Sequence, residues 1–81
     1  MNTFNTVVFK FSMGDVDDPD IYAAQSIMQW QSTESGKWIM DHALYLPKWE
    51  RYADPYQHGW TFTVRATLSP ENYTFWKLKY A

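Results

Sequence analysis

The sequence predicts an α+β domain with the element order β-α-β-β, in which one helical layer packs on a three-stranded, mainly antiparallel sheet. Residues 3–13 and 60–68 alternate apolar and polar side chains, which is the period of a half-buried strand. Residues 73–80 alternate again after a turn at 69–72, so they predict a third strand in a hairpin with 60–68. Residues 19–43 are the only stretch long enough for an extended helix.

The alternation assigns a core face to each strand. In the first strand we expect Val8 to point outward with its polar neighbours. The residues expected in the core are Val7, Phe9, Phe11 and Met13 from the first strand, Trp60, Phe62, Val64, Ala66 and Leu68 from the second, and Trp76, Leu78 and Tyr80 from the third.

The helical stretch lies between a start signal and a stop signal. An aspartate-rich turn places Pro19 at the first helical position, and Pro47 ends the stretch. Gly36 stands inside, in the weakly helical run 32–36, at a cost of about 1 kcal/mol relative to alanine. We therefore expect either one kinked helix or two shorter helices.

Composition limits the class of protein. The chain has 81 residues, enough for a single domain (residues 1–81), and no cysteine for a disulfide or a thiolate metal site. Aromatic residues make up 20% of it, more than so small a core can hide, so we expect some of them at an interface.

The net charge of −2 argues against a nucleic-acid partner. No apolar run approaches the roughly 20 residues of a membrane span and no signal-peptide pattern is present, so we expect a cytoplasmic protein.

No catalytic constellation stands out. There is no G-x-S-x-G serine and no glycine-rich phosphate loop, and the only histidines, His42 and His58, lack zinc-site spacing. We expect structural roles for them, with His42 buried, and a binding role as the alternative for His58, which lies in the aromatic connection. The acidic turn, residues 15–20, fails the EF-hand pattern, because Asp20 and Ser26 occupy the positions that require Gly and Glu. We expect a solvated, helix-capping charge cluster or a negative patch for a basic partner, with a looser divalent-cation site as the open alternative.

Residues 44–59 form an aromatic-rich connection with a short extended piece at 48–52. A connection of this length is usually functional, and Trp, Tyr and Arg dominate binding hot spots; a lid folded over the core is the alternative. Three strands also leave two open sheet edges, which predict a homodimer. The predicted partner-binding surface combines the connection with the acidic turn and consists of Asp15, Asp17, Asp18, Asp20, Tyr45, Trp49, Arg51, Tyr52, Tyr56 and His58.

Three segments, GDVDDPDIYAA (14–24), WQSTESGKWIMDHA (30–43) and FWKLKY (75–80), resemble small proteins of unknown function encoded by tailed bacteriophages. The resemblance spans most of the chain and carries no chemical signature or functional residue. It implies a phage accessory protein that acts in the bacterial cytoplasm, where such proteins often bind a host protein or block a defence system.

These observations lead to three hypotheses. The favoured one is a non-enzymatic protein, without cofactor or metal, that binds a macromolecule, with a host protein as the expected partner. The second is a small-ligand binder, such as a nucleotide sponge, in which Lys48, Arg51 and Arg65 meet phosphates. The third is a metal-dependent hydrolase built on the acidic turn.

Overall fold

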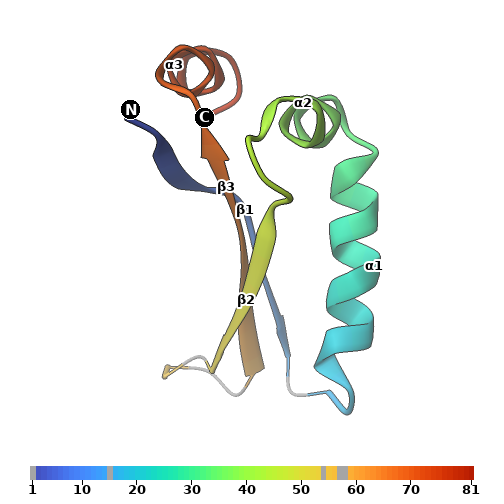
Figure 1. Ribbon diagram of the computed structural model, residues 1–81. Coiled ribbons are helices and arrows are strands. Elements are labelled where there is room, and N and C mark those ends of the chain that lie inside the picture. Colours follow the sequence, from blue (N-terminus) through green and yellow to red (C-terminus); the bar gives the residue numbers. More distant parts are fainter. Residues whose placement is uncertain (1, 15, 54, 57–58) are drawn as a thin grey trace.

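The computed structural model describes residues 2–14, 16–53, 55–56 and 59–81. The elements are β1 (Phe4–Gly14), α1 (Pro19–Gln31), α2 (Glu34–His42), β2 (Lys48–Ala53), β3 (Gly59–Leu68) and α3 (Pro70–Lys79). Figure 1 shows α1 and α2 on one side of the sheet, α3 at one end of it, and no helix on the other side. The α+β class and the three-stranded antiparallel sheet are confirmed, whereas the element order is β-α-α-β-β-α.

The central strand of the sheet is β3. It pairs antiparallel with β1 on one side and with β2 on the other. The register places Phe62 opposite Phe11 and Val64 opposite Trp49. The third strand of the sheet is therefore β2, the short extended piece of the mid-chain connection. The two edges of the sheet are formed by β1 and β2.

The predicted strand at 73–80 is wrong, because this segment lies within α3, and the hairpin does not exist. Ser69 caps the helix by accepting a hydrogen bond from the Asn72 N–H at 3.3 Å, and Pro70 sits in the first turn, where a missing N–H is harmless. Of the side chains expected in the core, Trp76 is buried but Leu78 is 84% exposed.

The long helical stretch is split into two helices, the second of its two expected forms. Thr33 begins α2: its Oγ1 accepts a hydrogen bond from the Gly36 N–H at 3.1 Å, and its hydroxyl donates to the Trp30 carbonyl at 2.6 Å. A Cβ on Gly36 would lie 1.8 Å from the Trp30 carbonyl oxygen. Gly36 is thus required by the close approach of α1 and α2, and is not merely a weak helix former.

A bulge in β1 reverses the predicted alternation in the first half of the strand. The register to β3 shifts between Val7 and Phe9. Val8 is consequently buried, where we expected it to point outward, and Val7 is half-buried. Beyond the bulge the prediction is correct for Phe9, whose ring stacks 5.3 Å from the ring of Trp30 in α1.

The core lies between the sheet and the helices α1 and α2, and α3 closes one end of it. Its buried apolar side chains are Val8, Ala23, Ile27, Trp30, Ile39, Phe62, Val64, Ala66, Leu68 and Trp76.

We call the other side of the sheet the open face; it carries Asn5, Lys48, Glu50, Tyr52, Arg65 and Thr67. None of the helices in the described part of the chain is long and apolar enough to cross a membrane.

Candidate binding site

The strand β2 is an edge strand that is exposed along its whole length. It pairs with β3 on one side, and every residue from Lys48 to Ala53 is exposed. Trp49 lies on the helix side, with its ring 5.7 Å from that of Phe62, whereas Tyr52 lies on the open face; they are 42% and 46% exposed. An exposed edge with an aromatic side chain on each face is a template for pairing with another chain.

Arg51 joins β2 to the acidic turn. Its Nη1 lies 2.9 Å from Asp20 Oδ1, and its guanidinium lies 4.6 Å from the centroid of the Trp60 ring. The ion pair is exposed, with side chains 40% and 60% in solvent, so it contributes only about 0–1 kcal/mol. The contact shows that the start of α1 lies beside β2, so Asp20 of the acidic turn meets the aromatic connection at Arg51.

The remaining aspartates and tyrosines of that surface are spread more widely. Asp17 and Asp18 are exposed. Asp18 precedes α1 with φ 51°, and its side chain makes no capping hydrogen bond, so the expected carboxylate cap is wrong. Tyr56 is 94% exposed. Asp15 and His58 lie outside the described residues.

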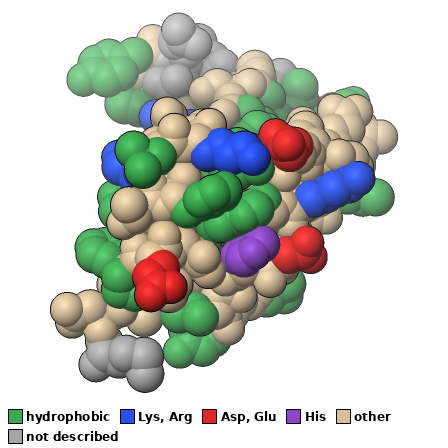
Figure 2. Space-filling model, turned by 90° about the horizontal axis from the view of Figure 1, so that it is seen from above, with side chains coloured by type: hydrophobic (Ala, Val, Ile, Leu, Met, Phe, Trp, Pro, Cys, Tyr) green, Lys and Arg blue, Asp and Glu red, His purple; other side chains and the backbone are tan. Residues whose placement is uncertain are grey.

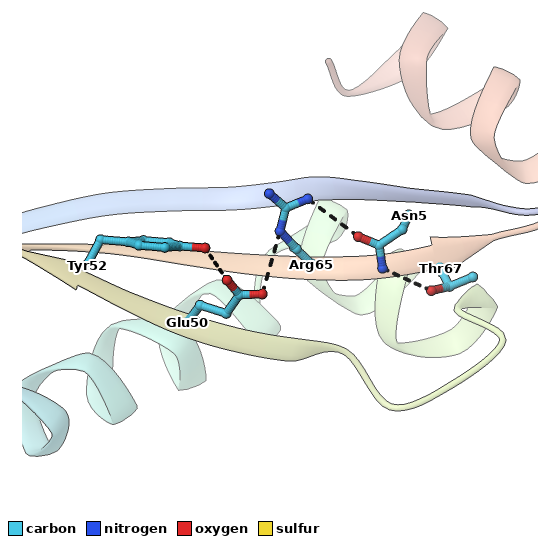
Figure 3. A network of polar contacts seen from close by, with 5 residues as sticks. All are labelled: Asn5, Glu50, Tyr52, Arg65 and Thr67. Carbon is cyan, nitrogen blue, oxygen red and sulfur yellow. Dashed lines mark hydrogen bonds and ion pairs between the residues drawn. The ribbon is translucent and has the colours of Figure 1, made fainter.

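A chain of polar contacts crosses the open face (Figure 3). The Tyr52 hydroxyl donates to the Glu50 carboxylate, which lies 3.7 Å from Arg65 Nε. Arg65 Nη1 donates to Asn5 Oδ1 at 3.4 Å, and Asn5 Nδ2 donates to Thr67 Oγ1 at 3.2 Å. The hydrogen bond to Glu50 raises the pKa of the Tyr52 phenol above its ordinary value, and desolvation and the Glu50 charge act in the same direction. The contacts hold the Arg65 guanidinium from two sides.

The network borders a hollow of about 470 Å³ on the open face. Its lining residues come from all three strands and from the connection before β2: Asn5, Tyr45, Leu46, Lys48, Glu50, Arg65 and Thr67. Of the three cations in the nucleotide hypothesis, Lys48 and Arg65 line it, whereas Arg51 is on the helix side. Tyr45 also lines the hollow, whereas Trp49 packs against Phe62 on the helix side of the sheet. Sequence reasoning named Arg65 but missed Asn5 of β1 and Thr67 of β3, because only the strand register brings these residues together.

A second aromatic cluster lies where α2 meets α3. The Trp38 ring stacks on His42 at 4.3 Å and on Phe75 at 5.2 Å, and Lys79 Nζ lies 5.4 Å from the centroid of the Tyr80 ring. Figure 2, which looks onto this end of the molecule, shows hydrophobic side chains bordered by charged ones. His42 is exposed, so its predicted burial is wrong. These rings stack on one another across the two helices, so we interpret the cluster as a helix junction.

The described part of the acidic turn, residues 16–20, gives no geometric support to a metal centre. Within the described ranges, no group of three or more His, Asp or Glu side chains is placed to hold a metal ion. The Asp20 carboxylate of this turn is engaged by Arg51.

Comparisons with protein-family models, with curated proteins and with solved structures find no match to this chain. The described side chains form two candidate binding sites: the exposed edge of β2 with the acidic turn beside it, and the hollow on the open face.

Proposed function

We propose that this protein is a non-enzymatic binding module that docks a segment of another protein along the exposed edge of β2. The observation that carries the proposal is the edge itself: a strand of six residues, all exposed, that pairs only with β3. Its outer N–H and C=O groups make no hydrogen bond to other described residues, so they can pair with an extended segment of a partner, which supplies affinity through main-chain hydrogen bonds.

Side chains along β2 give this edge its specificity. Trp49 and Tyr52 lie on opposite faces of the sheet, so they flank an added strand from both sides. Both lose exposed ring surface when a partner covers them, and Trp and Tyr are the residues that most often carry binding energy. The Asp20 carboxylate lies beside the edge through the Arg51 ion pair, and with the exposed Asp17 and Asp18 before it in the chain it favours a partner segment with basic residues.

A stable complex needs more contact than one short strand provides. Standard interfaces bury roughly 800 Å² on each partner. The first turns of α1 extend the surface, because Ile21 and Tyr22 follow Asp20 and are 64% and 53% exposed. The phage resemblance supports a host protein in the bacterial cytoplasm as the partner, and a regulatory or anti-defence role as the consequence.

The test begins with capture and identification of a partner from host lysate, followed by binding isotherms with the purified pair. Trp49→Ala and Tyr52→Ala should each weaken binding about tenfold or more, as hot-spot truncations do. Trp49→Phe keeps a ring against Phe62 and separates lost binding from lost packing. Leu78→Ala removes an 84% exposed side chain on α3 and serves as the matched control. Unchanged binding in both alanine variants, with the fold intact by circular dichroism, would discard this surface.

Hydrogen exchange tests the docking mode itself. Backbone amides of β2 that point away from β3 exchange quickly in the isolated protein and should become protected in the complex. If amides elsewhere become protected while these β2 amides exchange as quickly as before, the partner does not add a strand to the sheet.

The same edge also supports the homodimer expected from an open sheet. A second copy pairing through β2 would extend the sheet to six strands and compete with a partner for the edge. Light scattering at high protein concentration should then give twice the subunit mass, and the mass of one subunit would rule this dimer out.

A further inference from the structure

We propose that the hollow on the open face binds a small organic phosphate that carries a planar ring, of the size of a nucleoside monophosphate. The site joins two cations, Lys48 and Arg65, to an exposed ring, Tyr45, across a space of about 470 Å³. Ligand sites for small molecules typically enclose about 300–1,000 Å³. The proposal is independent of strand docking at β2, because it uses the open face and not the edge.

The cation pair is the first line of evidence. Lys48 and Arg65 are direct partners in the β2–β3 register, so their side chains emerge next to each other on the same face. Like charges directly opposite each other destabilise a sheet. Glu50 offsets only one of them, through its contact with Arg65, and Lys48 has no ion pair or hydrogen bond within the described residues. Positive charge is left in excess, and an anion placed between the two would remove the repulsion.

The positioning of Arg65 is the second line of evidence. Glu50 lies 3.7 Å from its Nε, and Asn5 accepts from its Nη1 at 3.4 Å. These contacts leave further guanidinium N–H groups available, and a planar guanidinium that is already oriented suits a phosphate group. The neighbouring Lys48 ammonium supplies a second, mobile charge for the same group.

The part of the lining that comes from residues 45 and 46 suits a planar ring. Tyr45 and Leu46 are 71% and 79% exposed, and the chain is anchored just before them, because the Leu44 N–H donates to the Thr67 carbonyl at 2.9 Å. Bases stack readily on a tyrosine ring without regard to sequence. The Glu50 carboxylate, on the same wall as Lys48, is an acceptor for sugar hydroxyls, which adds a preference for a ribosyl compound.

The probe for the test is AMP, titrated into the full chain by calorimetry and followed by amide chemical shifts. Three arms separate the parts of the ligand: adenosine lacks the phosphate, inorganic phosphate lacks the ring, and benzoate carries a carboxylate on a ring. AMP should bind at least about tenfold more tightly than any of the three, because only it satisfies both ends of the site. Shifts should be confined to β1, β3, β2 and residues 44–46.

Variants then locate the site. Lys48→Gln and Arg65→Gln should each weaken AMP binding about tenfold, the usual effect of losing a charged hydrogen bond, and Tyr45→Ala should weaken adenosine and AMP alike. Arg51→Gln is the matched control, since Arg51 pairs with Asp20 on the other side of the sheet, and it should leave AMP affinity unchanged. Lys48 is exposed at the sheet edge, so its substitution tests the site without loss of folding.

Each remaining outcome overturns the proposal. If AMP does not bind at millimolar concentration, or binds Lys48→Gln as tightly as the native chain, the hollow is not a phosphate site. If benzoate binds as tightly as AMP with the same dependence on Lys48 and Arg65, the ligand class is a carboxylate. Trp49→Ala, which tests strand docking, should leave AMP affinity unchanged, so the two proposals fail separately.

Discussion

Replacing Gly36 with alanine is expected to destabilise the fold, although alanine is the better helix former. Helix propensity alone favours the change by about 1 kcal/mol. The new Cβ, however, would lie 1.8 Å from the Trp30 carbonyl oxygen and 2.9 Å from the Gln31 Cα, and both atoms belong to the backbone. Reaching an ordinary contact of about 3.5 Å requires the start of α2 to move by more than an ångström. That movement also breaks the 3.1 Å hydrogen bond between the Gly36 N–H and Thr33.

The size of the effect follows from these opposing terms. Overpacking against backbone costs about 3 kcal/mol, the upper part of the usual range. Loss of the Thr33 cap costs about 1 kcal/mol, which offsets the gain in propensity, so the net loss is about 3 kcal/mol. A domain of 81 residues has a total stability of only about 4–12 kcal/mol. The melting temperature should therefore fall by roughly 12–24 °C.

Urea unfolding, followed by tryptophan fluorescence and circular dichroism, measures this difference. Gly14→Ala is the matched control, because a Cβ on Gly14 meets nothing within 4 Å, and its stability should change by less than about 1 kcal/mol. A midpoint for Gly36→Ala at or above that of the native chain would refute the close approach of α1 and α2.

Three further predictions test single contacts. Tyr52→Phe should remove from an alkaline absorbance titration a phenol whose pKa lies above the ordinary value. Because the folded-state pKa of Tyr52 is raised above the ordinary 10.0, the hydrogen bond to Glu50 stabilises the fold below that pH and is lost as pH rises through the folded value; an unaltered titration contradicts this. Thr33→Ala should lower the free energy of unfolding by about 1 kcal/mol while Thr33→Ser retains most of it, and equal losses would argue against a capping role. A double-mutant cycle on Asp20 and Arg51 should give a coupling below about 1 kcal/mol that shrinks with added salt, whereas a salt-independent coupling would mean that the pair is buried in solution.

The prediction from sequence was correct where a clear alternation of apolar and polar residues coincided with a strand packed against helices on one face. Residues 60–68 alternate without interruption because β3 is central and covered by helices on one side only. The split of the helical stretch was among the expected forms, since residues 32–36 combine weak helix formers with a glycine. In β1 a bulge of one residue was enough to exchange the burial of Val7 and Val8, and no local period reveals such a slip.

The segment 70–79 was mispredicted because two periods fit the same residues. Its alternation suggested a strand, but Tyr73, Trp76 and the following Tyr80 also recur at helical spacing, and all three are buried or half-buried. The deciding signal was the start: Ser69 before Pro70 is the same cap-then-proline pattern that correctly began α1 at Pro19. Giving terminal signals precedence over a short alternation would have predicted the helix.

The candidate sites are formed by residues that lie far apart in the sequence, and no local sequence pattern shows that such residues meet. The expected union of the acidic turn with the aromatic segment occurs through Asp20 and Arg51, which are 31 positions apart. The hollow was out of reach, because it requires Lys48 opposite Arg65 and Asn5 opposite Thr67. Register is set by packing and by turn geometry, so side chains that meet across strands can be assigned only once the sheet is known.

The alternation within β2 makes its two proposed roles separable. Odd positions, Trp49 and Arg51, face the helices and the acidic turn, whereas even positions, Lys48, Glu50 and Tyr52, belong to the open face. A strand added to the edge contacts both sets, because its side chains also alternate. A ligand in the hollow contacts the even set alone. Substitution of Trp49 should therefore affect a docked strand and leave the ligand of the hollow unchanged, whereas substitution of Lys48 should affect both. A partner protein sensitive only to even positions would bind across the open face and not along the edge.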